Sequence, residues 1–153
     1  MAEYSANAIQ IVNPGESIVF TETPSACPRG FVRHRDGSGS FLLSGWTPRR
    51  SCGCRSKSAS YLVDFCANIA IPDGGTVEAI SVALAIDSST IPASQMIVTP
   101  AAVEEYFNVS RAIGVDVWSG CCETVSIVNN GTQPILVQNA NVIFSRPDLA
   151  VTY

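Results

Sequence analysis

The segment SASYLVDFCANIAI, residues 58–71, alternates apolar side chains with small or polar ones. This period of two is the spacing of a β-strand with one buried face. The apolar face would consist of Tyr61, Val63, Phe65, Ala67 and Ile69. The turn-forming run Pro72-Asp73-Gly74-Gly75 ends the pattern. The segment therefore predicts one long strand at the centre of an all-β domain.

The next segment, TVEAISVALAIDSS at residues 76–89, shows the same alternation without a charged face. One side carries bulky residues, namely Ile80, Val82, Leu84 and Ile86. The other side carries small ones, namely Ala79, Ser81, Ala83 and Ala85. We expect both faces of this strand to be covered.

The rest of the chain continues in short alternating runs separated by turn residues. IVNPGESIVF, from Ile11, predicts either two short strands or one strand broken at Asn13-Pro14-Gly15. GFVRHR and SFLLSGW predict a hairpin around Asp36-Gly37 and Gly39. Further strands are expected in IPASQMIVT, RAIGVDVW, ETVSIVNN and PILVQNANVIFSR. The one helical signal is TPAAVEEYF from Thr99, at most two turns long.

These features predict an all-β jelly-roll sandwich of about eight to ten antiparallel strands. An immunoglobulin fold is disfavoured because no Trp is flanked by two cysteines at the expected separation. At 153 residues we expect a single domain, 1–153, with residues 1–10 as an extended N-terminal arm.

The chain is 46% hydrophobic and only 14% charged, which excludes a disordered protein. A composition this apolar favours an oligomer, in which the copies cover part of each other's apolar surface. No apolar run approaches the roughly 20 residues that span a bilayer, and LVDFCANIAI carries Asp64 and Asn68. The start, MAEYSANAIQIV, has no signal-peptide pattern, so we expect folding in a cytoplasm and no membrane partner.

Charge is distributed unevenly along the chain. Between Arg29 and Lys57 seven basic residues stand against one acid, Asp36. Eight of the nine basic residues are Arg, whose planar fork pairs well with carboxylates. We expect a surface that docks an acidic partner, built from Arg33, Arg35, Arg49, Arg50, Arg55 and Lys57. The alternative is ion pairing within the protein or between its copies.

Nucleic-acid binding is not expected, since it needs aromatic or base-reading groups among the basic ones. Only Phe31 and Trp46 meet that description.

The six cysteines leave several interpretations open. They are Cys27, Cys52, Cys54, Cys66, Cys121 and Cys122. Disulfides are the leading interpretation, with inert thiols and a zinc site as alternatives. Zinc is disfavoured because neither a one-residue gap nor a vicinal pair matches the usual ligand spacing, so we expect no metal. The segment TPRRSCGCRSK, residues 47–57, would then be an exposed loop tethered to Cys66, Cys27 or the Cys121-Cys122 turn.

Catalytic patterns are weak. His34 is the only histidine, and no G-x-S-x-G motif supplies a nucleophile. Glu104-Glu105 and Asp73 lie outside any calcium-loop pattern, and Gly37-Ser38-Gly39 is too short for a phosphate loop. We therefore expect a protein that is not an enzyme and has no cofactor.

A further group of segments consists of NPGESIVFTETP, GFVRHRDGSGSFLLSG, ANIAIPDGG, VEAISVALAID, IVTPAAVEEYFNVS, and VDVWSGCCETVSIVNN with PILVQNANVIF. Together these segments resemble a group of small head fiber-like proteins of tailed phages and prophages of gut Firmicutes. That group is similar in turn to the trimeric jelly rolls of the tumour-necrosis-factor (TNF) and complement-C1q type. One departure is that no Gly-X-Y repeat precedes the globular part.

The resemblance implies a homotrimeric structural protein that decorates a phage capsid. Its partners would be its own copies and the major capsid protein, on the virion exterior after assembly in the host cytoplasm. The alternative is an adhesin or receptor-binding head that recognises a host surface glycan. Aromatic residues are the expected trimer contacts, namely Tyr61, Phe65, Tyr106, Phe107, Trp118 and Tyr153. The partners of the asparagines in VQNANVIF are not predicted from the sequence.

Overall fold

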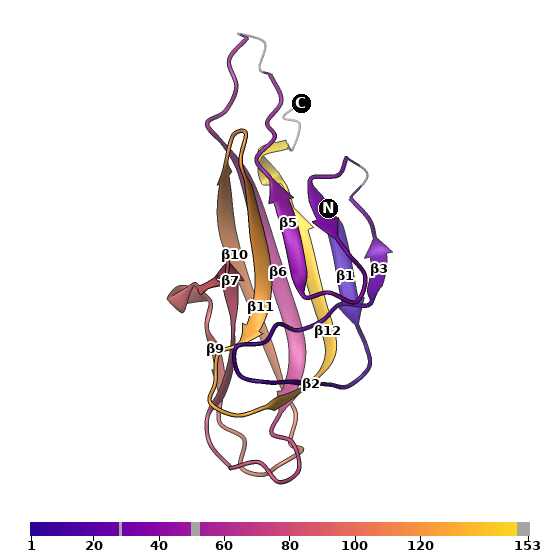
Figure 1. The fold of residues 1–153 in the computed structure, drawn as a ribbon, viewed down its shortest axis with the longest axis vertical. Coiled ribbons are helices and arrows are strands. Elements are labelled where there is room, and N and C mark those ends of the chain that lie inside the picture. The colour runs from indigo at the N-terminus through magenta and orange to yellow at the C-terminus, as the bar shows by residue number, and fades with distance from the viewer. Residues whose placement is uncertain (28, 50–52, 150–153) are drawn as a thin grey trace.

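The computed structural model describes residues 1–27, 29–49 and 53–149. Within these residues twelve strands form two six-stranded antiparallel sheets that pack around one core (Figure 1). This confirms the predicted all-β sandwich, with more strands than the expected eight to ten because several short edge strands add to the count.

Sheet A follows the order β10-β6-β12-β1-β3, and β2 pairs with the first part of β12. Its strands are β1 (Ala2–Ala6), β2 (Gln10–Val12), β3 (Glu22–Ser25), β6 (Ser58–Ala70), β10 (Phe107–Trp118) and β12 (Ile135–Ser145). The predicted long strand at residues 58–71 is β6, and it lies between β10 and β12. Its register with β10 is unbroken from Ser58–Trp118 to Ile69–Phe107.

Sheet B follows the order β4-β5-β11-β7-β8, and β9 also pairs with β7. Its strands are β4 (Val32–His34), β5 (Ser40–Ser44), β7 (Ile80–Ile86), β8 (Ser89–Thr90), β9 (Met96–Val98) and β11 (Cys122–Asn129). The predicted hairpin is β4–β5. Two short 3₁₀ helices complete the described elements, η1 (Pro92–Ser94) and η2 (Pro147–Leu149).

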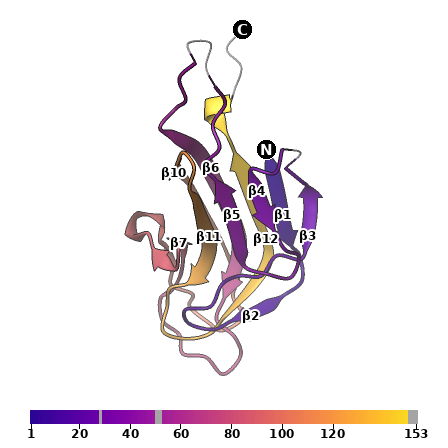
Figure 2. The same ribbon diagram turned by 45° about the horizontal axis from the view of Figure 1, so that its top comes forward.

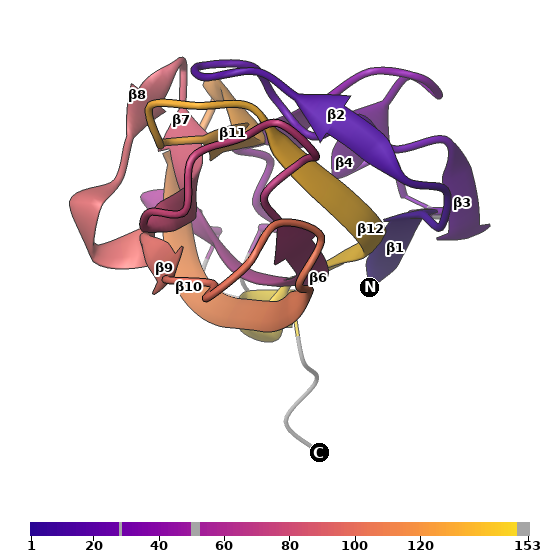
Figure 3. The same cartoon turned by 90° about the horizontal axis from the view of Figure 1, so that it is seen from below.

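The core lies between the inward faces of the two sheets, which surround it when the molecule is seen from below (Figure 3). Tyr61, Val63 and Phe65 of β6 all point into it and are almost completely buried. His34 also faces inward, because its ring stacks on Phe41 at 4.4 Å between centroids. The period-two pattern of β6 therefore identified the buried face correctly.

The molecule is elongated, with different segments at its two ends (Figures 1 and 2). Residues 46–49 and 53–57, here called the apex loop, project at the upper end beside the β10–β11 turn and η2. The loop between β6 and β7 lies at the lower end. Met1 and Leu149 line one hollow near the apex, so the start of the chain and the last described residues lie close together.

Two expectations about local structure are wrong. Residues 1–10 do not form a detached arm, because Ala2–Ala6 pair with both β12 and β3 as β1, with Ala2, Tyr4 and Ala6 buried. The segment from Thr99 is not helical. There the Glu105 carboxylate accepts hydrogen bonds from the N–H groups of Ala101 and Ala102, which closes a turn.

A β-bulge explains the asparagines of β12. The register with β6 shifts between Gln138 and Asn141, and Asn139 takes a left-handed backbone conformation at φ 52°. Beyond the bulge, the Asn141 amide donates to the Glu3 carboxylate at 2.7 Å.

No helix among the described residues is long and apolar enough to cross a membrane.

Candidate functional site

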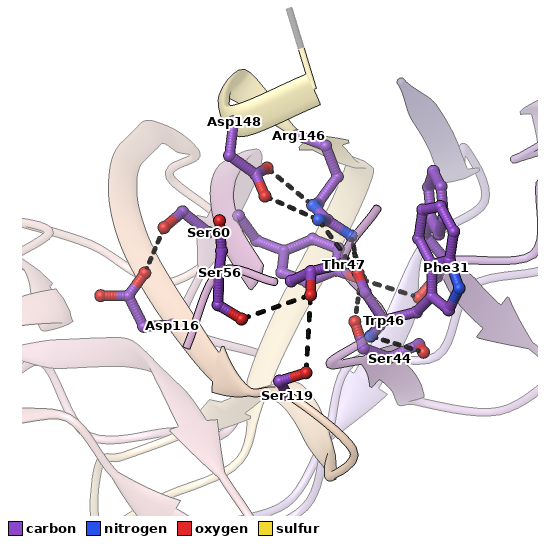
Figure 4. Close-up of polar contacts among 11 residues, drawn as sticks. Phe31, Ser44, Trp46, Thr47, Ser56, Ser60, Asp116, Ser119, Arg146 and Asp148 are labelled. Atoms are coloured by element: carbon purple, nitrogen blue, oxygen red, sulfur yellow. Dashed lines mark hydrogen bonds and ion pairs between the residues drawn. The ribbon is translucent and has the colours of Figure 1, made fainter. Parts of the chain in front are cut away.

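The upper end is organised by Arg146, which directly follows β12. Its Nε and Nη2 donate to the two carboxylate oxygens of Asp148, at 2.8 and 2.7 Å (Figure 4). Nη1 and Nη2 also donate to the Trp46 carbonyl, at 3.3 and 3.2 Å. The Arg146 side chain is only 6% exposed. The bidentate contact with Asp148 holds the guanidinium in place. Its hydrogen bonds to the Trp46 carbonyl then fix the start of the apex loop to the end of β12.

Three aromatic rings lie against this guanidinium or next to it. Its Cζ atom lies 4.9 Å from the centre of the Phe31 ring and 4.8 Å from that of Tyr61. Both distances are within the range of cation–π attraction. The Trp46 indole stacks on Phe31 with 5.4 Å between ring centroids and 21° between planes. We call Trp46 and Phe31 the aromatic platform.

Hydrogen bonds hold the backbone of the platform in place. The Tyr61 hydroxyl lies 2.6 Å from the Ser44 carbonyl and 3.1 Å from the Phe31 carbonyl. Burial raises the pKa of this hydroxyl, so it remains a donor at neutral pH. The hydrogen bonds from Arg146 lower the pKa of Asp148, which keeps that carboxylate charged.

Two hollows lie beside the platform and share Arg29 and Phe31. One, of about 300 Å³, is lined by Arg29, Gly30, Phe31, Arg33, Ser44 and Trp46. The other, of about 320 Å³, extends past Cys27 to Tyr61 and Arg146. Trp46 remains 45% exposed.

The predicted docking residues fall into two groups. Arg33 lies on the edge strand β4, where it lines a further open hollow of about 450 Å³ together with Arg35. Arg49 and Arg55 are paired by their backbones within the apex loop, and Lys57 follows at its base. Arg50 lies outside the described residues. Sequence reasoning did not select Arg29 or Arg146, whose neighbours come from distant parts of the chain.

The described basic residues of these two groups form no ion pair with another described residue. The one ion pair in residues 1–27, 29–49 and 53–149 joins Arg146 to Asp148. Pairing within one copy therefore does not explain Arg29, Arg33 or Arg35, all of which are exposed. Exposed positive charge therefore remains on this part of the described surface.

The cysteines are spread over the molecule, and no disulfide joins Cys27, Cys66, Cys121 and Cys122 to one another. Cys66 is wrong as a tether for the apex loop, because it lies eight residues along β6 from Ser58, about 26 Å away at the usual rise of a strand. Cys121 lies beside the base of the apex loop, since its carbonyl accepts from the Gly45 N–H. Cys52 lies outside the described residues, so the pairing of the loop stays a prediction.

Burial acts to raise the pKa of the Cys27 thiol, yet that pKa is lowered because the backbone N–H groups of Val32, Phe31 and Arg29 point at the sulfur. Burial raises the pKa of Cys66, and the charges of Asp64 and Glu3 add to this effect.

The expected trimer contacts are only partly at the surface. Tyr61 and Phe65 are core residues and cannot touch another copy, which corrects that expectation. Trp118 is 63% exposed and Phe107 is 38% exposed, while Tyr106 is half-buried. Tyr153 lies outside the described residues.

The outward side of sheet A, away from the core, is a more extensive accessible surface. Leu62 on β6 is 42% exposed at its centre. Its neighbours on β10 are small, which leaves the surface flat. We call this surface the open face; it contains Leu62, Asp64 and Cys66 of β6, Ser110, Ala112 and Gly114 of β10, and Asn141, Ile143 and Ser145 of β12.

The possible catalytic and metal-binding groups do not come together. Both ring nitrogens of His34 face backbone carbonyls, Nδ1 at 3.0 Å from Ser40 and Nε2 at 3.2 Å from Phe20. In the described part of the chain no three His, Cys, Asp or Glu side chains are close enough to hold a metal ion. The arrangement can hold a ligand or a partner by charge and stacking.

Comparison with known proteins identifies the fold. No protein-family model matches the chain. No curated protein matches it either. Among solved structures, the Eiger TNF of S. frugiperda aligns with a TM-score of 0.65 and 10% identity, over 99% of this chain and 93% of that one. The globular domain of a zebrafish complement 1qA protein aligns at 0.55 and 11% identity, over 93% and 94%. The chain therefore has a jelly-roll fold similar to that of these TNF and C1q domains.

Proposed function

We propose that this protein is a non-enzymatic structural head that assembles as a homotrimer and attaches to a phage capsid as a decoration protein. The observation that carries the proposal is the separation of two surfaces. The open face of sheet A has small side chains around Leu62 and no basic residue among those that define it, whereas Arg49, Arg55 and Lys57 of the apex loop form no ion pair with a described carboxylate.

The open face suits contact between copies. Its central Leu62 and the small side chains of Ala112 and Gly114 would be buried when sheets of neighbouring copies approach. Cyclic symmetry buries such a face in every copy and leaves no apolar surface to aggregate. A homotrimer is the assembly implied by the resemblance to TNF and C1q jelly rolls.

The apex loop suits attachment to an acidic surface. Arg49, Arg55 and Lys57 are exposed residues of the apex loop. Three copies in one trimer would present three such loops, so that weak contacts combine into tight binding. The partner we propose is the major capsid protein on the exterior of the virion.

Light scattering at low and high salt, with and without reductant, tests the assembly. We expect three times the chain mass of 16.2 kDa in every condition. A salt-insensitive monomer would contradict the trimer and with it most of the decoration hypothesis.

Cosedimentation with empty capsids tests the attachment. We expect binding that weakens as salt rises and that falls when Arg49 and Arg55 are both replaced by Gln. The matched control replaces Arg111, an exposed arginine of β10, which should leave capsid binding unchanged.

A second candidate function is recognition of a host surface glycan by a receptor-binding head. The aromatic platform favours it, because an exposed indole beside a hollow is a surface on which a sugar ring can pack. Loss of binding to host cells after Trp46→Ala, with the trimer and the capsid contact intact, would support this candidate.

A further inference from the structure

We propose that the hollow beside Trp46 binds an acidic sugar, with the sugar ring packed on the indole and its carboxylate held by Arg29 and Arg33. The proposal rests on the second candidate function, glycan recognition, and is independent of attachment to a capsid. It names a site and a ligand class for that function.

The size of the hollow suits a ring-sized ligand. Its volume of about 300 Å³ lies at the lower end of the range for small-molecule sites. Its lining includes one exposed aromatic side chain, two guanidinium groups and the Ser44 side chain region. These groups provide an apolar surface, positive charge and hydrogen-bonding capacity within one concave site.

The platform is held in place before any ligand arrives. The backbone N–H of Trp46 donates to the Ser44 hydroxyl at 3.2 Å, and the backbone carbonyl of Trp46 accepts from Arg146. The indole stacks on Phe31, whose ring also contacts the Arg146 guanidinium. A fixed ring loses little conformational freedom on binding, which favours affinity.

The charge of the hollow favours an anionic ligand. Arg29 and Arg33 are exposed and form no ion pair with a described carboxylate. The one acid in this part of the sequence, Asp36, accepts instead from the Thr23 hydroxyl at 3.2 Å. Two guanidinium groups at one hollow match a carboxylate, because the planar fork donates two parallel hydrogen bonds to its oxygens.

The aromatic arrangement favours a sugar over a nucleic-acid strand. Single-strand binding proteins stack successive bases on several aromatic side chains. Here Phe31 and Trp46 stack on each other, so the platform offers one exposed ring for one ligand ring. An acidic peptide would satisfy the arginines but has no flat apolar ring face for the indole.

Titration calorimetry with four probes tests the ligand class. The probes are trigalacturonic acid, its neutral methyl ester, a ten-residue oligothymidylate and hexaglutamate. We expect the acid to bind and the ester to bind at least about tenfold more weakly, since charge-assisted hydrogen bonds are lost. Equal binding of acid and ester would overturn the proposal, as would absence of binding of the acid at millimolar concentration.

Matched variants locate the site. Arg29→Gln and Arg33→Gln should each weaken binding of the acid about tenfold, whereas Arg55→Gln in the apex loop removes the same charge and should change it less than twofold. Trp46→Ala should weaken it at least about tenfold, whereas Trp118→Ala, at the other exposed tryptophan, should not. Should Trp46→Ala fail to fold, the two arginine variants still decide the question.

Two further outcomes would overturn the proposal. One is an equal loss of binding in Arg55→Gln and Arg33→Gln, which would indicate unspecific attraction to positive charge. The other is tighter, Trp46-dependent binding of oligothymidylate or hexaglutamate than of the acid sugar. Light scattering on the same samples shows whether the trimer is intact. It therefore distinguishes loss of ligand binding at the hollow from loss of the assembly.

Discussion

At the scale of single residues, Arg146 and Asp148 determine how the upper end is held together. Replacing Asp148 by Asn removes the carboxylate that accepts two hydrogen bonds from Arg146. We expect a loss of about 1–2 kcal/mol in the free energy of unfolding at pH 7, measured by urea denaturation.

The effect of this substitution should depend on pH in one direction. The folded-state pKa of Asp148 is lowered, so its carboxylate stabilises the fold above the pKa of the unfolded chain, near 4. That stabilisation is lost as pH falls toward the lower folded-state value. The difference between the wild-type protein and Asp148→Asn should therefore narrow from pH 7 to pH 3, and an unchanged difference would contradict the ion pair.

The cysteines allow a second test at this scale. We expect iodoacetamide at pH 7 to alkylate Cys27 faster than Cys66, because backbone N–H groups lower the pKa of Cys27 while burial raises that of Cys66. Mass spectrometry of peptides after short labelling times measures the order. Earlier labelling of Cys66 would show that access rather than thiolate fraction controls the reaction.

At the scale of elements, Gly45, which links β5 to the apex loop, packs backbone against backbone with the β10–β11 turn. A Cβ atom there would collide with the Trp118 carbonyl oxygen and lie 2.8 Å from that of Cys121. We expect Gly45→Ala to lower the free energy of unfolding by about 1–3 kcal/mol or more, in the range of overpacked sites.

Gly114 on β10 provides the control for this substitution. A Cβ atom there would meet nothing closer than the Tyr61 carbonyl oxygen at 4.0 Å. Gly114→Ala should therefore not lower the stability of a single chain. Because Gly114 lies on the open face, the two glycine substitutions are compared in chains that also carry Leu62→Asp, which keeps the copies apart. Equal effects of the two substitutions in thermal or urea unfolding would contradict close packing at Gly45.

Local patterns predicted the elements, but not the contacts between them. Alternation identified β6 and the β4–β5 hairpin because strand period and turn residues are both local signals. The same alternation separated Tyr61 and Phe65 from Leu62, but it does not say which face meets another copy. The charge of the basic segment was likewise evident from the sequence.

The contacts that the sequence did not indicate join residues that lie far apart in the chain or depend on a shift of strand register. Arg146 reaches Trp46 across one hundred positions, and no local pattern encodes such a pair. The stacking of Trp46 on Phe31 also requires the end of β5 to lie beside the residue before β4. The bulge at Asn139 shifts the register of β12, which a strict period of two cannot anticipate.

At the scale of the whole molecule, the open face determines whether copies associate. Replacing Leu62, at its centre, by Asp adds a second carboxylate close to Asp64, on a surface that would be buried between neighbouring copies. Burying an unpaired carboxylate is costly, so we expect the mass in light scattering to fall from three times 16.2 kDa to a single chain.

Leu42 on β5 is the matched control for Leu62, because it is 37% exposed on the outward side of the other sheet. Leu42→Asp introduces the same charge at a similar exposure and should leave the trimer intact. If the trimers of both variants dissociate, association depends on the overall charge of the protein rather than on the open face. If Leu42→Asp alone dissociates, sheet B and not sheet A forms the contact, and the proposed arrangement of the copies is wrong.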